Sequence, residues 1–183
     1  MDKSSSKTFT TSRGFIYSYH RCEPTGESLE KADPTDPPLP VLLFLHGFPT
    51  SSLIWKHQIK YFQERRFAAI VPDLLGFGGT SKPKEAGAYK TSLICQDLIE
   101  LLDAEDVHDH QVVAIGHDQL SFIHCMKGLV VNFCCRGSRI VSRLAGFYPN
   151  RCRAYAFIAD PYNPPRPMTD LDFSVAVVGC RLT

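Results

Sequence analysis

VVAIGHD, residues 112–118, is the stretch that decides the fold class of this chain. Its first four residues form a short and wholly apolar run, which is typical of a central parallel strand that is covered on both faces. The run leads into Gly116, and a sharp turn at this glycine would lift the side chain of Asp118 above the sheet. We therefore expect a parallel sheet with a candidate functional residue at the carboxyl end of this strand.

The same alternation of strand and helix extends to both sides of this stretch. Two apolar runs, VLLFL and FAAIV, precede it, and the segments between the runs carry apolar side chains at helical spacing. At the N-terminus, Phe15, Tyr17 and Tyr19 occupy every second position, which predicts an antiparallel hairpin with residues 7–11. The predicted strands are residues 41–45, 67–71, 112–115 and 154–159, and the predicted helices are residues 55–66, 91–102 and 138–148. This pattern indicates an α/β fold with a mostly parallel sheet.

The first apolar run ends in the tetrapeptide His46-Gly47-Phe48-Pro49. Gly47 permits a close approach of the backbone, and Pro49 removes a donor and is compatible with a cis peptide bond. Such a turn can aim the N–H of Phe48 at a developing oxyanion. The alternative interpretation is an ordinary Gly-Pro turn.

The segments that follow the other two predicted strands, residues 67–71 and 112–115, indicate different kinds of structure. Residues 72–83, PDLLGFGGTSKP, do not fit the dinucleotide fingerprint, since Ser81 stands where its last glycine would be, and we predict a structured loop. At the third exit, an Asp at the apex of a strand-to-helix turn can act as a nucleophile that forms an alkyl-enzyme ester. Taken alone, Asp118 fits a helix cap better.

The composition is that of one globular domain, with 44% apolar and 21% charged residues among 183. The net charge of +1 excludes a strong overall attraction to nucleic acid or to an anionic membrane surface. The longest apolar run, residues 154–159, is far short of the roughly 18 residues that suggest a membrane span. Seven cysteines without a C-x-x-C pattern, and no signal peptide, predict reduced thiols in a cytoplasmic protein. We expect neither metal nor cofactor.

Taken together, four motifs resemble those of the α/β-hydrolase superfamily, specifically its soluble epoxide hydrolase branch of fungal type. They are HGFPTS (46–51), PDLLGFGGTSKP (72–83), VVAIGHD (112–118) and GSRIVSRLAGFYPNR (137–151). The resemblance extends from residue 7 to about residue 167 with one interruption. It implies a partial α/β-hydrolase fold in a single domain over residues 1–183, and an Asp at the elbow distinguishes epoxide hydrolases and haloalkane dehalogenases from esterases and lipases.

The resemblance also implies a role for each matching residue. Asp118 would be the nucleophile that attacks an epoxide carbon, and the backbone N–H groups of Phe48 and Gln119 would form the oxyanion hole. His46 would stabilise its turn rather than act as the base, and His117 would be a packing residue of the elbow. The residues of structural importance in the motifs are His46, Gly47, Pro49, Gly116 and His117.

The chain departs from the family pattern directly after the nucleophile. The pattern reads Gly-His-Asp-x-Gly-Ser, whereas here the 18 residues 119–136 separate Asp118 from Gly137 and Ser138. The segment, QLSFIHCMKGLVVNFCCR, is rich in apolar residues and cysteine and has few turn residues. We interpret it as an anomalous insertion, either a translated short intron or a genuine loop.

A second departure concerns the catalytic base. The resemblance implies a helical cap, then two more strands that carry the catalytic acid and His, but every His of this chain lies at or before His124. Residues 160–183 would be the start of a cap or a misread tail, so the cap and the last strands are expected to be missing. We therefore expect the chain as given to be inactive.

Two other functions are compatible with the sequence, and they differ in whether Asp118 acts as a nucleophile. A haloalkane or fluoroacetate-type dehalogenase would use the same Asp118 but would hold a leaving halide. A non-catalytic, truncated gene product would use no nucleophile. Similarity over residues 137–167 favours the epoxide branch, with a small-molecule epoxide or related apolar compound as substrate.

Overall fold

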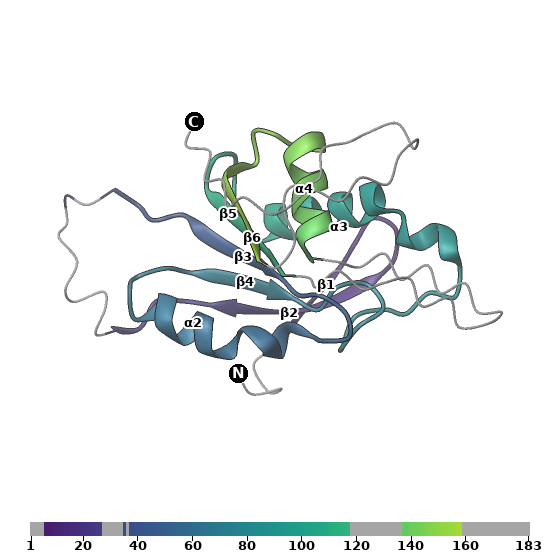
Figure 1. Ribbon diagram of the computed structural model, residues 1–183, viewed down its shortest axis with the longest axis horizontal. Helices are drawn as coiled ribbons and strands as arrows, with labels where there is room; N and C mark the ends of the chain where they lie inside the picture. Colours follow the sequence, from purple (N-terminus) through teal and green to yellow (C-terminus); the bar gives the residue numbers. More distant parts are fainter. Residues whose placement is uncertain (1–5, 27–34, 36, 118–136, 159–183) are drawn as a thin grey trace.

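The computed structural model describes residues 6–26, 35, 37–117 and 137–158, and these contain a six-stranded mixed sheet with helices on both faces (Figure 1). The strand order is β1-β2-β4-β3-β5-β6, and the pairs among β4, β3, β5 and β6 are parallel. The strands are β1 (Lys7–Thr10), β2 (Ile16–Cys22), β3 (Val41–Leu45), β4 (Ala69–Pro72), β5 (Val112–His117) and β6 (Cys152–Ile158). The helices are α2 (Lys56–Gln63), α3 (Thr91–Ala104) and α4 (Gly137–Phe147), with the 3-10 turns η2 (Ser52–Trp55) and η3 (Ala86–Tyr89). The expected mostly parallel sheet is confirmed.

Strand β3 is apolar at every position because both of its faces are covered. Leu43 and Leu45 belong to the core cluster that contains the buried residues of α3 and α4. Leu42 and Phe44 point to the opposite face and join a second cluster, which contains Ile59 of α2. Successive side chains of a strand alternate between faces, so a strand that is covered on both sides needs apolar residues throughout.

The connections place α2 on one face of the sheet and α3 and α4 on the other (Figure 1). The step from β3 to β4 goes to one side of β3, and the next connection passes back across β3 to β5. Since such crossovers are right-handed, reversing their direction moves the connecting helix to the other face. Strand β3 therefore lies at the topological switch point, where open α/β sheets bind ligands beyond the carboxyl ends of their strands.

The N-terminal hairpin is confirmed in its position and its direction. Lys7 pairs with Tyr19 and Thr10 pairs with Ile16 in antiparallel register. Gly14 has a φ of 79°, which allows the tight connection between the two strands. Hydrogen bonds from Ser12 to the Glu100 carboxylate, at 2.7 and 2.6 Å, attach this turn to α3.

The predicted helix over residues 55–66 is shorter than expected. A 3-10 turn ends at Trp55, and α2 then runs only to Gln63. Arg66 has a left-handed φ of 73°, and the N–H of Phe67 bonds back to the Phe62 carbonyl at 3.1 Å, so the chain leaves the helix there. Strand β4 accordingly begins at Ala69, two residues after the predicted start.

Candidate active site

The ends of β3, β4 and β5 lie at one edge of the sheet, because the three strands are parallel and adjacent. Leu45 at the end of β3 pairs with Gly116 of β5, and Leu43 pairs with Ile70 of β4. The residues that follow these pairs belong to the three motifs singled out in the sequence. The structure therefore brings the His46 turn, the loop after β4 and the end of β5 together at the switch point.

His46 connects two of these segments through both of its ring nitrogens. The Leu74 N–H donates to Nε2 at 2.9 Å, so Nδ1 carries the proton and donates to the Gly47 carbonyl at 3.0 Å. The side chain is fully buried, and this burial lowers the pKa of His46, which keeps the imidazole neutral at neutral pH. With both nitrogens occupied, His46 holds the turn to the loop after β4.

The turn after β3 contains a cis peptide bond between Phe48 and Pro49. The backbone N–H and the hydroxyl of Thr50 both donate to the Gly47 carbonyl, at 3.1 and 2.7 Å, and close the turn. Phe48 is 52% exposed, and its ring lies edge-on to Phe77 with the ring centroids 6.1 Å apart. The turn thus presents an apolar ring at the carboxyl edge of the sheet.

Asp73, which the sequence did not mark as a site residue, organises the loop after β4. Its two carboxylate oxygens accept from the backbone N–H groups of Ser52, at 2.8 Å, and of Gly79, at 2.9 Å. Burial alone would raise the pKa of Asp73, but these donors outweigh it and hold the pKa below its ordinary value. A Cβ added to Gly78 would lie 1.8 Å from the carboxylate, which explains the glycine there. An Asp at a strand end followed by two adjacent glycines is the signal that could have indicated this role.

The end of β5 is packed directly against the start of α4. A Cβ on Gly116 would lie 2.5 Å from the carbonyl carbon of Gly137, and a Cβ on Gly137 would lie 2.2 Å from the Leu45 carbonyl oxygen. The hydroxyl of Ser138 donates to the Gly116 carbonyl at 3.0 Å. The close approach of strand and helix therefore requires glycine on both sides.

Asp118 and Gln119, the predicted nucleophile and second oxyanion donor, lie outside the described residues. His117, which directly precedes Asp118, ends β5, and its ring lies edge-on to Trp55 with centroids 6.1 Å apart. His117 thus packs at the carboxyl edge, on the α2 side of the sheet.

The part of the chain that the structure describes contains neither a metal site nor a membrane span. No group of three or more His, Cys, Asp and Glu side chains there is arranged to hold a metal ion. None of the helices described has the length and apolar character needed to cross a membrane.

Comparisons with known proteins agree with this geometry. A family model described as the α/β-hydrolase fold matches residues 40–126. Bifunctional epoxide hydrolase 2 of Mus musculus is 32% identical over 128 residues, which are 70% of this chain and 20% of that protein. Epoxide hydrolase 2 of Siraitia grosvenorii is 42% identical over 79 residues, which are 43% of this chain and 24% of that protein.

Solved structures show the same similarity. An epoxide hydrolase from Vigna radiata superposes with a TM-score of 0.66 at 26% identity, covering 90% of this chain and 42% of that one. The chain therefore matches less than half of the length of these relatives. The fold and the strand-end motifs define a protein of the α/β-hydrolase fold. Within that class, the chain is epoxide hydrolase-like.

Proposed function

We propose that this chain carries the nucleophilic half of an epoxide hydrolase-type active site, with Asp118 as the nucleophile. A carboxylate oxygen of Asp118 would attack an epoxide carbon, and the ring C–O bond would break as the new ester bond forms. The ring oxygen stays bonded to the other epoxide carbon as an alkoxide, and it takes a proton from solvent or from an acid donor. The product of this step is an alkyl-enzyme ester.

The observation that carries the proposal is the position of His117, the residue before Asp118. His117 ends β5 beside the switch-point strand β3, and α4 begins against it at Gly137. A residue that directly follows the end of such a strand stands at the edge where open α/β sheets bind their ligands. The Phe48 turn approaches the same edge from β3.

Hydrolysis of the ester would use the backbone N–H groups of Phe48 and Gln119. Water attacks the ester carbonyl carbon, and the negative charge that develops on the carbonyl oxygen is stabilised by these two donors. The diol leaves as the carboxylate of Asp118 is restored. This step needs a general base to take a proton from the water.

We further propose that residues 1–183, as a separate polypeptide, do not complete this cycle. Both ring nitrogens of His46 are engaged, and the last His in the sequence is His124. The segment 119–136 would be an insertion in a single α/β-hydrolase domain, and its residues 120–136 separate Gln119 from the start of α4 in the sequence. Ester formation on Asp118 without release is the expected outcome.

Intact-protein mass spectrometry after incubation with a styrene-type epoxide tests both parts of the proposal. We expect one covalent adduct with the mass of the epoxide, mapped to Asp118 by peptide analysis and absent in Asp118→Ala. No such adduct in the folded chain would refute the nucleophile. Diol formed repeatedly and dependent on Asp118 would refute the block in hydrolysis.

A further inference from the structure

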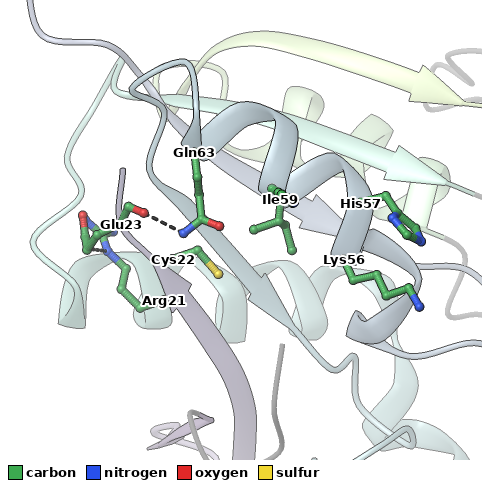
Figure 2. A pocket seen from close by; sticks show the side chains of 8 residues that line it. Arg21, Cys22, Glu23, Lys56, His57, Ile59 and Gln63 are labelled. Atoms are coloured by element: carbon green, nitrogen blue, oxygen red, sulfur yellow. Dashed lines mark hydrogen bonds and ion pairs between the residues drawn. The ribbon is translucent and has the colours of Figure 1, made fainter. Parts of the chain in front are cut away.

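A concave surface lies between the end of β2 and the length of α2, and the proposed reaction does not use it. Figure 2 shows the pocket, whose volume is about 600 Å³. Pockets of this size hold small organic molecules. The residues that line it are Arg21, Cys22, Glu23, Lys56, His57, Ile59, Lys60 and Gln63.

The charge of this pocket differs from that of the molecule as a whole. Three of its side chains, Arg21, Lys56 and Lys60, are cationic, and one, Glu23, is anionic. Arg21 pairs with Glu23 and, at 3.8 Å, with Glu105, so the uncompensated +2 of the lining belongs to Lys56 and Lys60. The entire chain carries only +1. Positive charge is thus concentrated at this pocket, where it attracts anions.

The single acid of the pocket is already engaged. The Glu23 carboxylate accepts from Arg21 Nε at 2.6 Å, and the Glu23 backbone carbonyl accepts from Gln63 Nε2 at 2.6 Å. Figure 2 shows both contacts on the same side of the pocket. Lys56 and Lys60 form no ion pair with any of the described residues.

The direction of α2 adds to this positive potential. Lys56 is the first residue of the helix, His57 is the second, and the first turn contains no acid. The amino end of a helix carries partial positive charge, so a cation placed there is unfavourable. Lys60 stands one turn further on, and like charges at this spacing repel each other. A bound anion would relieve both repulsions.

The floor of the pocket is apolar. Ile59 is 2% exposed, and Cys22 is partly buried against the same core cluster. Burial raises the pKa of the Cys22 thiol, so it stays neutral and does not oppose an anion at neutral pH. The pocket therefore combines an apolar floor with cationic walls.

We propose that this pocket binds a small molecule that carries a phosphate group on an apolar body. Phosphate fits the cationic walls, because the ammonium groups of Lys56 and Lys60 donate charge-assisted hydrogen bonds to phosphate oxygens. The apolar body lies over the floor of the pocket, against the partly exposed Cys22. The proposal is independent of Asp118.

Calorimetric titration of the full chain with phenyl phosphate tests the proposal, with the ionic strength held constant. We expect saturable binding, weaker binding of inorganic phosphate and no binding of phenol. The double variant Lys56→Gln/Lys60→Gln should lose at least about tenfold in affinity, since hydrogen bonds to charged groups are the strong ones.

The matched control is Lys84→Gln/Lys90→Gln, which removes the same charge from exposed positions outside the pocket. The control should bind like the unmodified chain, and circular dichroism should show that both variants fold. Phenyl phosphate that fails to saturate, or an equal loss in the control, would overturn the proposal.

Discussion

At the scale of single residues, the buried carboxylates determine how the loops are held to the sheet. Asp73 accepts backbone hydrogen bonds from two separate segments. Asp97 of α3 accepts from Tyr17 and Arg13 of the hairpin, each at 2.9 Å. One carboxylate thus fixes the edge of the candidate site, and the other attaches the N-terminal hairpin to the body of the fold.

Replacing Asp73 should destabilise the fold. Asp73→Ala leaves the N–H groups of Ser52 and Gly79 without their acceptor, and we expect the free energy of unfolding to fall by about 2–4 kcal/mol. Urea unfolding followed by tryptophan fluorescence measures this change. Asp109→Ala, which removes an exposed carboxylate paired with Arg151 at 3.3 Å, is the control and should cost less than about 1 kcal/mol. Equal effects of the two changes would contradict the role of Asp73.

Asp97 should make part of the stability depend on pH. Burial raises the pKa of Asp97 to about 6, against the lowering effects of Tyr17 and Arg13. The folded protein therefore holds this proton more tightly than the unfolded chain, whose Asp has an ordinary pKa near 4. The contribution of Asp97 to stability is complete below about pH 4 and decreases as the pH rises through about 6.

Urea unfolding at several pH values isolates the contribution of Asp97 to the free energy of unfolding. The unmodified chain is compared with Asp97→Asn. Other carboxylates change stability in both proteins alike, so the difference between the two curves reports Asp97 alone. We expect the unmodified chain to lose stability relative to the variant between pH 4 and pH 6. A constant difference across this range would show that Asp97 does not titrate there.

At the scale of elements, the contact between β5 and α4 depends on the missing side chain of Gly137. Gly137→Ala places a methyl group 2.2 Å from the Leu45 carbonyl oxygen and 2.8 Å from the His117 carbonyl oxygen. Because backbone atoms must move, we expect a loss of about 1–3 kcal/mol in the free energy of unfolding. Gly87→Ala is the matched control, since no atom lies within 4 Å of its added Cβ. Denaturant unfolding of both variants measures the free energy of unfolding. An equal loss in the two variants would contradict the role of Gly137.

The sequence predicted elements well where local pattern and burial agree. Residues 41–45 were identified to the residue because both faces of β3 are covered, and the hairpin followed from its alternating aromatics. The helix predicted from Trp55 begins one residue later, after a 3-10 turn whose Ser52 N–H bonds to Asp73, 21 positions along the chain. The position of the phosphate-binding pocket proposed above also depends on such distant contacts, because β2 and α2 are brought together only by the sheet.

At the scale of the whole molecule, β5 ends at His117 beside the start of α4 at Gly137. The His117 carbonyl oxygen lies 2.8 Å from a Cβ built on Gly137, so two residues suffice to join β5 to α4 at roughly 3.5 Å per residue. We predict that deleting residues 120–136 leaves the sheet intact. The shorter connection should raise the unfolding free energy by about 1–2 kcal/mol through loop-closure entropy.

Circular dichroism and thermal unfolding of the deletion variant measure this outcome. A midpoint equal to or above that of the unmodified chain agrees with a dispensable insertion. Loss of cooperative unfolding would show instead that the segment is needed by the fold. Sequencing the transcript tests the intron interpretation separately, because a spliced message would lack these codons.

The order of the strands also affects events during synthesis on the ribosome. Strand β3 lies at the centre of the sheet, yet both of its neighbours, β4 and β5, come later in the chain. The roughly 70 residues from the start of β3 to β5 take about 4–14 s to make at ordinary elongation rates. Through that interval Leu42 to Leu45 have no complete sheet to cover them, so a nascent chain of this protein exposes an apolar strand that invites chaperones or premature association.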